Sequence, residues 1–534
     1  MKNKYKHKQV VKPRSGVEIF ISRISERVMR FYVARRKLFN VVIYLAIFAC
    51  ALSLRVTSIT SKHELHSDEV YSLAISTCDP NYNIPLPDGE YSGNDLKNRL
   101  VASGNTGMKG TIDDLVQLWH NNGDAPHASL YYMALRVALT GLDCWDVERY
   151  IRRGGALNLL FFCLSFYVML RLLRRIFGRK DLVVYAGLAV AFLNVMSVRN
   201  TMMLREYQMA ETAVLVLTFV TVGIVQKMRE GRLFSKWRTV VALSLSIAAV
   251  ISLGYFNAFY VAALCCVLCV AAWRYKRPRV VTMTIFSGIL AVAIAWLLYS
   301  GFFMFILYKT PHQTLAFRNF SMSVSFAWGR DLCHLLFTRY GYFVIVATLI
   351  AGVVTRGTLR RLFLQKNFVW LPLIVLLIMP LVQYASVLKQ PRYYFALMPI
   401  LMLIVPQVLM AMSSLWRSYF GLLIVLFFSI VMPQVKFKDV YAWQSARNNL
   451  ATPVAFYRLN PNELMQLTPN LDDHIIYTVA NKMPLDSLLD AHGKAQIVTM
   501  PAKVDGKRYK FVGKQVWAWD KRYFLLDLEK NEDK

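Results

Sequence analysis

The segment Lys62–Tyr71, KHELHSDEVY, holds the densest group of side chains with chemical potential in this sequence. Adjacent carboxylates at Asp68 and Glu69 follow two imidazoles, His63 and His66. A carboxylate held within hydrogen-bond reach of a hydroxyl group acts as a general base. The same pattern also fits an acidic turn that caps a helix beginning near Glu69, so both interpretations stay open.

The same segment also admits a metal site, because imidazoles and carboxylates are ligands of zinc and other divalent ions. No fixed spacing selects such a site. A divalent metal therefore stays an open alternative, with no cofactor expected firmly; the candidate ligands are His63, Glu64, His66, Asp68 and Glu69, with His127 or His312 approaching in space.

Cations form two further clusters. RNTMMLREYQMAE, residues 199–211, contains Arg205, and KQPRYYFALMP, residues 389–399, contains Lys389 and Arg392. A guanidinium suits a phosphate because it offers parallel donors and keeps its charge. The alternative for Arg205 is an ion pair with Glu206 or a side chain that reaches water.

Long apolar blocks separate these clusters. Val41–Val56, Ala156–Leu173 and Leu182–Val198 are examples, and a near-continuous series runs from Val240 to Val435. Crossing about 30 Å of hydrocarbon takes roughly 20 residues of α-helix, and lipid requires the backbone to be satisfied within each segment. The sequence therefore predicts a mainly α, polytopic membrane protein.

The formal net charge of +31 follows the membrane topology. Residues 1–38 contain twelve Lys/Arg and two Asp/Glu, and further basic clusters fall in alternate connections, as the positive-inside rule requires. The excess favours contact with anionic membrane lipids and excludes a nucleic-acid partner. Residues 17–36 alternate apolar and basic side chains, which predicts a helix along the cytoplasmic surface.

The topology depends on Tyr131–Leu142. The segment has about 12 residues, too few for a span, and it carries Arg136. A surface-lying helix there places every later basic cluster on the cytoplasmic side and gives about eleven spans, with twelve or thirteen as variants. Residues 58–150 then form a first outer loop, which has thirteen acidic and six basic residues between Ser58 and Arg149.

Three regions follow from this topology: a basic cytoplasmic segment over 1–38, a membrane domain over 39–435, and a C-terminal soluble region over 436–534. Strand-like runs, split by Gly and Asp turns, predict a small α/β domain at the C-terminal end; they are His474–Ala480, Ala495–Met500, Arg508–Val512 and Tyr523–Leu528. Two cysteines of the outer loop, Cys78 and Cys144, could pair in an oxidising compartment.

Several motifs resemble the membrane-embedded GT-C glycosyltransferases, particularly the protein mannosyltransferase and aminoarabinose transferase group. HSDEVYSL is similar to the family's Asp-Glu motif after the first span, and GDAPHASLYYMALRVAL to its surface helix. MLREYQMAETAVL and PRYYFALMP resemble later Arg-Tyr segments. The chain departs from the family at Pro126–Ser129, where His-Pro-Pro is usual, which leaves the role of His127 in doubt.

The resemblance implies an inverting transfer of a sugar from a polyprenyl-phosphate carrier. It implies Asp68 as the catalytic base with Glu69 shaping the acceptor site, and Arg205 and Arg392 as ligands of the carrier phosphate. Their neighbours Lys389 and Tyr207 are further candidates for the phosphate site. The accessory and acceptor candidates are His66, His127, Tyr71 and Tyr131.

Two other classes stay open: a transporter or lipid flippase, and a non-catalytic protein that binds a carrier lipid. Transporters often carry ionisable residues at the bilayer midplane and an internal repeat, whereas the notable charges here gather at one surface. The sequence identifies neither sugar nor acceptor. The expected location is a bacterial inner membrane, with the site and the C-terminal region facing the periplasm.

Overall fold

The computed structural model describes residues 16–63, 65–78, 85–102, 107–120, 130–142, 146–232, 236–303, 329–330, 343–354, 361–362, 368–385, 391–431, 453–490, 492–516 and 524–530. The chain divides into two compact units, Met1–Ala49 and Cys50–Lys534. In the first unit the described residues belong to one helix, α1 (Gly16–Thr60), which continues into the second. The backbone of Arg35 leaves the helical region (φ −112°, ψ 19°), so the helix expected over 17–36 is present and ends at a kink. An apolar stretch suited to a span starts at Ala34.

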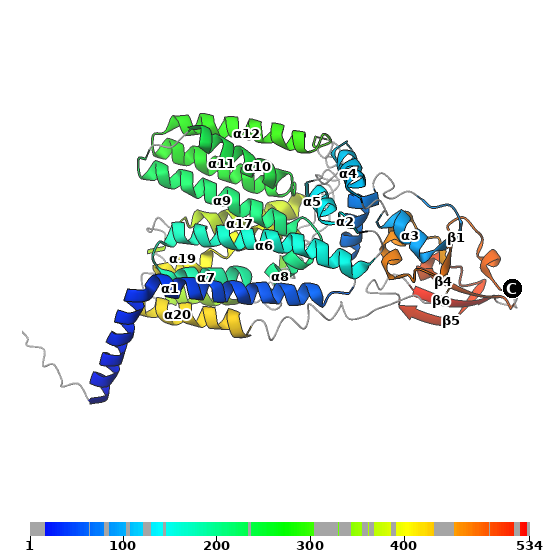
Figure 1. The fold of residues 1–534 in the computed structure, drawn as a ribbon, viewed down its shortest axis with the longest axis horizontal. Coiled ribbons are helices and arrows are strands. Elements are labelled where there is room, and N and C mark those ends of the chain that lie inside the picture. The colour runs from blue at the N-terminus through cyan, green and yellow to red at the C-terminus, as the bar shows by residue number, and fades with distance from the viewer. Residues whose placement is uncertain are drawn as a thin grey trace, which may run out of the picture. The chain divides into compact units, whose positions relative to one another are not determined.

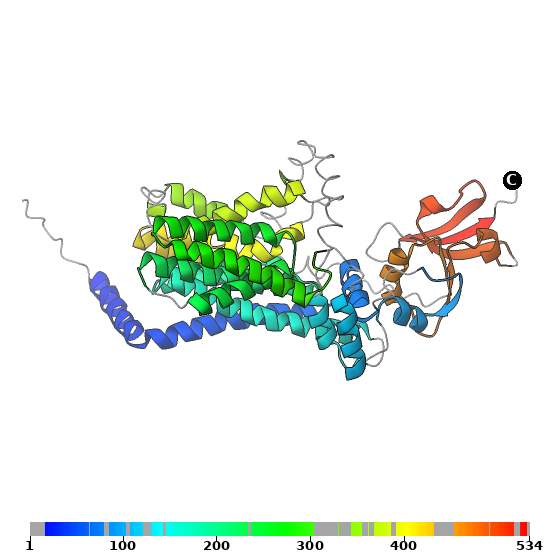
Figure 2. The same ribbon diagram turned by 90° about the horizontal axis from the view of Figure 1, so that it is seen from above.

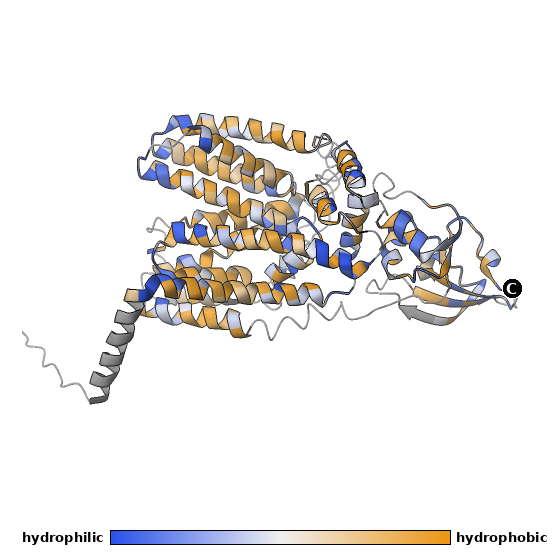
Figure 3. Ribbon diagram, in the orientation of Figure 1, coloured by the Kyte–Doolittle hydropathy of each residue, from blue (hydrophilic) through white to orange (hydrophobic). Residues whose placement is uncertain are grey.

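The second unit contains a bundle of apolar helices that lie side by side (Figures 1 and 2). Their residues are largely hydrophobic, as the colouring of the ribbon in Figure 3 shows. The long ones are α6 (Val147–Phe177), α9 (Tyr207–Arg229), α11 (Asn257–Arg274) and α12 (Pro278–Leu298). A bent pair, α7 (Asp181–Phe192) and α8 (Val195–Met202), turns by 53° at its break. The remaining members are α10 (Lys236–Ile251), α15 (Phe343–Val354), α17 (Trp370–Ala385), the run η2 (Pro391–Leu397), α18 (Met398–Leu401) and α19 (Ile404–Ala411), and α20 (Ser414–Leu426) with η3 (Phe427–Val431).

These helices make the protein a polytopic membrane protein. Within the described residues six helices, or seven with the bent pair, are long and apolar enough to cross a bilayer, and two more apolar helices are shorter. The count of eleven spans stays a prediction. The segment at Tyr131 forms α5 (Leu130–Ala138), whose nine residues reach only about 14 Å. It is too short to span, in agreement with the sequence.

The first outer loop contributes four short helices. Helices α2 (Ser67–Cys78), α4 (Met108–His120) and α5 lie at one end of the bundle (Figure 1), and α3 (Gly93–Leu100) contacts β1 (Gly89–Ser92) and, in the C-terminal region, η4 (Thr468–Asn470). Helix α5 packs against α2, α4 and α6. An ion pair joins α5 to α4, since Arg136 Nε lies 2.6 Å from Asp114 Oδ2. This packing fixes α2, the helix that carries Asp68 and Glu69.

The C-terminal region forms a six-stranded sheet of order β1-β3-β2-β4-β6-β5. Five strands come from the expected region, and strand-like runs of the sequence account for four of them. The strands are β2 (Ala455–Tyr457), β3 (Ile476–Ala480), β4 (Lys494–Thr499), β5 (Tyr509–Val516) and β6 (Phe524–Lys530), with the short helices α22 (Pro461–Leu467), η4 (Thr468–Asn470), η5 (Leu485–Leu488) and η6 (Pro501–Lys503) between them. One face of the sheet buries an apolar core that includes Tyr457, Ile497 and Leu526.

The sixth strand, β1 (Gly89–Ser92), comes from the first outer loop and was not expected from the sequence. It pairs antiparallel with β3, with Gly89 opposite Val479 and Ser92 opposite Ile476. The Asp88 carboxylate accepts hydrogen bonds from the backbone N–H groups of Asn481 and Lys482, both at 2.8 Å.

This pairing constrains the topology, because two paired strands lie on the same side of any membrane. The chain must therefore cross the membrane an even number of times between β1 and β3. Together with the span that ends α1, an odd total results. Eleven or thirteen spans satisfy this condition and twelve do not.

Candidate active site

Helix α2 begins with a local motif that places its two carboxylates differently. Residues Asp68 and Glu69 lie in its first turn, where the helix dipole favours negative charge. The Glu69 side chain turns back and accepts a hydrogen bond from the His66 backbone N–H at 2.7 Å, as the N3 acid of a capping box does. Asp68 points elsewhere and keeps about 15% of its side chain exposed. The neighbouring acids are therefore not equivalent.

Glu69 lies in a fully buried ion pair with Lys62. Its carboxylate also accepts a hydrogen bond from the Leu204 backbone N–H at 2.8 Å, and Lys62 Nζ donates to the Met202 carbonyl at 3.1 Å. Burial lowers the pKa of Lys62, and the Glu69 carboxylate opposes that shift. The pair joins the start of α2 to the segment between α8 and α9, so its contacts give it a structural role.

The carboxylate of Asp68 makes an ion pair with Arg392, which belongs to η2. The two residues are separated by 324 positions along the chain. About 28% of the Arg392 side chain is exposed, so this residue stays partly accessible beside Asp68. The structure thus brings together the acidic motif and the late cationic motif of the sequence.

Arg205 is the second guanidinium near α2, and it is almost fully buried. Its Nη1 donates to Ser72 Oγ at 3.3 Å and to the Tyr132 hydroxyl at 3.2 Å, and lies 3.5 Å from the Asp68 carbonyl oxygen. Its Nε lies 3.2 Å from Glu206 Oε2. The ion pair with Glu206 is therefore formed, while the phosphate role of Arg205 stays a prediction.

A buried polar network holds the backbone around Arg205. The Asn158 amide donates to the carbonyls of Thr201 and Met203 at 3.0 and 2.7 Å. Arg55 donates to Thr201 Oγ1 at 2.9 Å and to Ser197 Oγ at 2.6 Å. Buried polar groups of this kind specify one backbone arrangement when they are satisfied, so the position of Arg205 is well defined.

The His66 imidazole lies beside Asp68 and is neutral. Burial lowers its pKa to about 4, and Nδ1 is 3.2 Å from the Asp68 backbone nitrogen, from which it accepts a hydrogen bond. His63 is directed to another partner, with Nδ1 3.5 Å from Glu148 Oε1. Within the described part of the chain no three His, Cys, Asp or Glu side chains converge as metal ligands.

The other sequence candidates lie at varying distances from this cluster. Tyr207 begins α9 and its ring packs against Phe395, with centroids 5.6 Å apart. Tyr131 is buried on α5 and its hydroxyl lies 3.4 Å from Asn158 Oδ1. The Tyr71 hydroxyl accepts a hydrogen bond from Gln466. Five residues that the sequence analysis named lie outside the described ranges: Glu64, His127, Cys144, His312 and Lys389.

Sequence reasoning missed four side chains that contact these groups: Lys62, Ser72, Tyr132 and Gln466. Lys62 carried a usable signal, because a lysine seven residues before an acid, directly after a span, is a candidate partner. Ser72 follows Asp68 by one helical turn and so shares its face. Nothing in the local sequence of Gln466 indicated a contact with α2.

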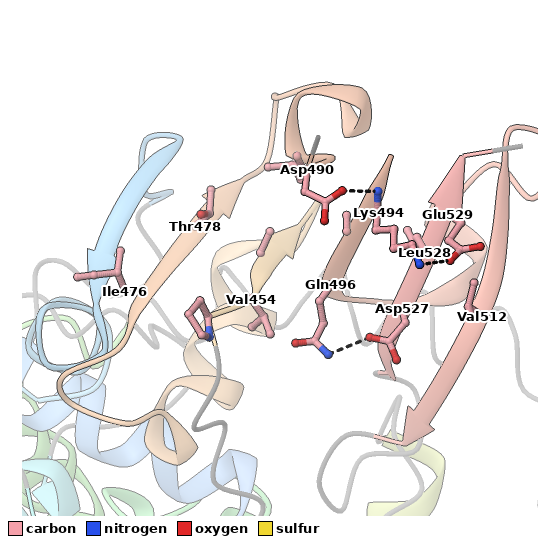
Figure 4. Close-up of a pocket in the computed structure, with 14 residues that line it drawn as sticks. Val454, Ile476, Thr478, Asp490, Lys494, Gln496, Val512, Asp527, Leu528 and Glu529 are labelled. Atoms are coloured by element: carbon pink, nitrogen blue, oxygen red, sulfur yellow. Dashed lines mark hydrogen bonds and ion pairs between the residues drawn. The ribbon is translucent and has the colours of Figure 1, made fainter. Parts of the chain in front are cut away.

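A separate cavity of about 620 Å³ lies against the C-terminal sheet (Figure 4). Its polar lining groups bond mainly to one another: Gln496 Nε2 donates to Asp527 Oδ1 at 2.8 Å, and Lys494 Nζ lies 2.8 Å from Glu529 Oε1. None of the candidate site residues lines this cavity. We therefore place the candidate active site at α2.

No family model matches the sequence, and no curated protein is detectably similar to it. Among solved structures, ArnT from Cupriavidus metallidurans in the apo state has a TM-score of 0.49 at 12% identity, over 90% of this chain and 97% of that chain. The structure of ArnT bound to undecaprenyl phosphate has a TM-score of 0.47 with the same identity and coverage.

Proposed function

We propose that this protein is a glycosyltransferase that moves a sugar from a polyprenyl-phosphate carrier to a lipid, glycan or protein acceptor. The observation that supports it most directly is the cluster at α2, where the Asp68 carboxylate pairs with Arg392 and Arg205 lies against the same helix turn. An acid and two guanidinium groups at one site suit a reaction that takes a proton and releases a phosphate.

In the proposed reaction, the acceptor hydroxyl oxygen attacks the anomeric carbon and Asp68 takes its proton. The bond between the anomeric carbon and the phosphate oxygen breaks, and the carrier leaves as polyprenyl phosphate with the bonding electron pair. Attack opposite the leaving phosphate inverts the anomeric carbon. Positioned cations stabilise the charge that develops on the leaving oxygen.

Because Asp68 is paired with Arg392, we propose that the carrier binds before the acceptor hydroxyl reaches Asp68. The phosphodiester anion of the glycosylated carrier competes with Asp68 for the partly exposed side chain of Arg392. Carrier binding then draws Arg392 away and leaves Asp68 available to the acceptor hydroxyl. Arg205, Lys389 and Tyr207 complete the phosphate site in this proposal, and Glu69 holds α2 in place.

We further propose that the site faces the periplasm of a bacterial inner membrane, on the side opposite the basic clusters. A transporter, a flippase or a passive carrier-binding protein is the competing class. The two classes differ in what they require of Asp68, because only an enzyme needs its carboxylate for turnover.

The test is conversion of glycosylated polyprenyl phosphate to free polyprenyl phosphate in membranes that contain the wild type or Asp68→Asn, followed by mass spectrometry. Loss of a general base typically lowers the rate by a factor of about 10²–10⁴, and the variant should still retain the carrier. Asp114→Asn, which also removes an ion-paired acid of the outer loop, is the matched control. An Asp68→Asn rate within twofold of the wild type would reject the enzymatic proposal.

A further inference from the structure

Helix α22 (Pro461–Leu467) brings the C-terminal region onto the helix that carries Asp68. Its first turn is fixed by a capping box, in which Asn460 Oδ1 accepts from the Glu463 backbone N–H at 2.9 Å and the Glu463 carboxylate accepts from Asn460 at 2.8 Å. At its C-terminal end, the hydroxyl of Thr468 donates a hydrogen bond to the Leu464 carbonyl. Helix α22 contacts α2, and Gln466 donates a hydrogen bond to the Tyr71 hydroxyl.

Two carboxamides on α22 have a buried atom without a partner among the described residues. These atoms are Asn462 Oδ1 and Gln466 Oε1. Residues four apart share one face of a helix and lie about 5–6 Å apart at Cβ, so both carboxamides lie on the face that Gln466 presents to α2. Exchanging the amide ends of Gln466 leaves its nitrogen unpaired instead of its oxygen, so one group lacks a partner in either orientation.

The partner of Gln466 stands close to the candidate base in the helix. Tyr71 follows Asp68 by three residues on α2, and residues three apart are neighbours on the helix surface. The two carboxamide oxygens without a partner therefore lie beside the face of α2 that carries Tyr71 and, three residues earlier, Asp68. Leaving a buried polar group without a partner costs free energy, which a ligand with hydrogen-bond donors would recover.

We infer that Asn462 and Gln466 form an acceptor subsite that binds the hydroxyl groups of a saccharide head group next to Asp68. The inference rests on the proposed function and specifies its acceptor as a saccharide. Carboxamide oxygens accept hydroxyl hydrogens without taking the proton, and their amide nitrogens donate to hydroxyl oxygens. A carboxylate in the same place would compete with Asp68 as a base.

The polar groups of the sheet cavity provide a contrast. There Gln496 is hydrogen-bonded to Asp527, and Lys494 is paired with Glu529. The α22 carboxamides combine burial, an unpaired atom and contact with the helix of the candidate base. This combination favours α22 over the sheet cavity as the acceptor subsite.

The experiment uses the full chain in phosphatidylcholine nanodiscs that contain undecaprenyl phosphate and a glycolipid with an oligosaccharide head group. Native mass spectrometry measures retention of each lipid by the wild type and by the double variant Asn462→Leu/Gln466→Met. We expect glycolipid retention to fall about tenfold or more for the loss of two hydrogen-bonding groups, while undecaprenyl phosphate retention stays within twofold. The matched control is Gln496→Met, a change of the same type in the sheet cavity. If Asn462→Leu/Gln466→Met unfolds the region, the single variant Asn462→Ala, which keeps the hydrogen bond between Gln466 and Tyr71, should still lower glycolipid retention.

Each outcome bears on one proposal. Equal glycolipid retention by the wild type and the folded double variant would overturn the subsite and leave the proposed function intact. Wild-type retention of the glycolipid without undecaprenyl phosphate would count against the carrier and so against the proposed function. Retention of a soluble oligosaccharide as tightly as the glycolipid would show that the subsite reads the saccharide alone. If a peptide displaces the glycolipid and the saccharide does not, the saccharide assignment is wrong.

Discussion

Removing the lysine of the buried Lys62–Glu69 pair should destabilise the protein strongly. In Lys62→Met, the Glu69 carboxylate loses its ion pair, and its remaining partners among the described residues are the backbone N–H groups of His66 and Leu204, at 2.7 and 2.8 Å. Breaking a buried pair on one side costs about 3–5 kcal/mol. Because two backbone donors still stabilise the carboxylate, we expect the free energy of unfolding to fall by about 3 kcal/mol.

The double variant Lys62→Met/Glu69→Gln should recover much of this loss. A glutamine carries no charge and its Oε1 can still accept one of the two backbone N–H bonds, so we expect the double variant to lie within about 1–2 kcal/mol of the wild type. The assay is equilibrium unfolding in mixed detergent micelles, read by the four proteins of a double-mutant cycle. Additive losses in the cycle, or a loss below about 1 kcal/mol in Lys62→Met, would refute the inference that Glu69 is a buried, paired carboxylate.

Three further outcomes are expected. The pKa of His66 falls from 6.5 to about 4 on folding, so the unfolded chain binds one more proton than the folded chain between these pH values. The free energy of unfolding should therefore be highest above about pH 6.5 and fall by about 1–3 kcal/mol towards pH 4. If the difference in this free energy between the wild type and His66→Asn does not change with pH, the prediction is wrong. A Cβ atom on Gly93 would lie 1.9 Å from the backbone oxygen of Asp472, so Gly93→Ala should lower the free energy of unfolding by about 1–3 kcal/mol or more. Faster proteolysis of the C-terminal region would report this loss. Gly107→Ala is the control, because a Cβ there meets no atom of the described residues within 4 Å. Arg205→Lys should weaken retention of undecaprenyl phosphate about tenfold or more, since lysine lacks the planar pair of donors; unchanged retention in a folded variant would remove Arg205 from the phosphate site.

The sequence predicted most of the architecture because its signals are local. Apolar length and basic clusters gave the helices, and the shortness and charge of the Tyr131 segment excluded a span there. Strand-like runs that are separated by Gly and Asp turns located four strands of the C-terminal region. Each of these signals lies within about 20 consecutive residues.

The contacts of the site were less predictable, since they join distant segments. Asp68 and Arg392 were both candidates, but no pattern indicated that they pair with each other. Adjacent acids looked alike in sequence, and only the fold separates a buried, paired Glu69 from a partly exposed Asp68. Strand β1 escaped notice because four residues in an acidic loop have no strand signature until β3 is present to pair with them.

The sheet combines β1 of the first outer loop with strands of the C-terminal region, so it can form only late in synthesis. Asp88 bonds to a residue 393 positions later, and Lys97 of α3 pairs with Asp473, 376 positions later, at 2.7 Å. At synthesis rates of about 5–20 residues per second, the first outer loop waits roughly 20–80 s after its own translation for these partners. Until α22 is made, α2 lacks one of the helices that contact it in the folded chain. A nascent chain interrupted before residue 461 would thus contain α2 without α22. If Asp68 is the base of the proposed reaction, activity would begin only after this last part of the chain is made.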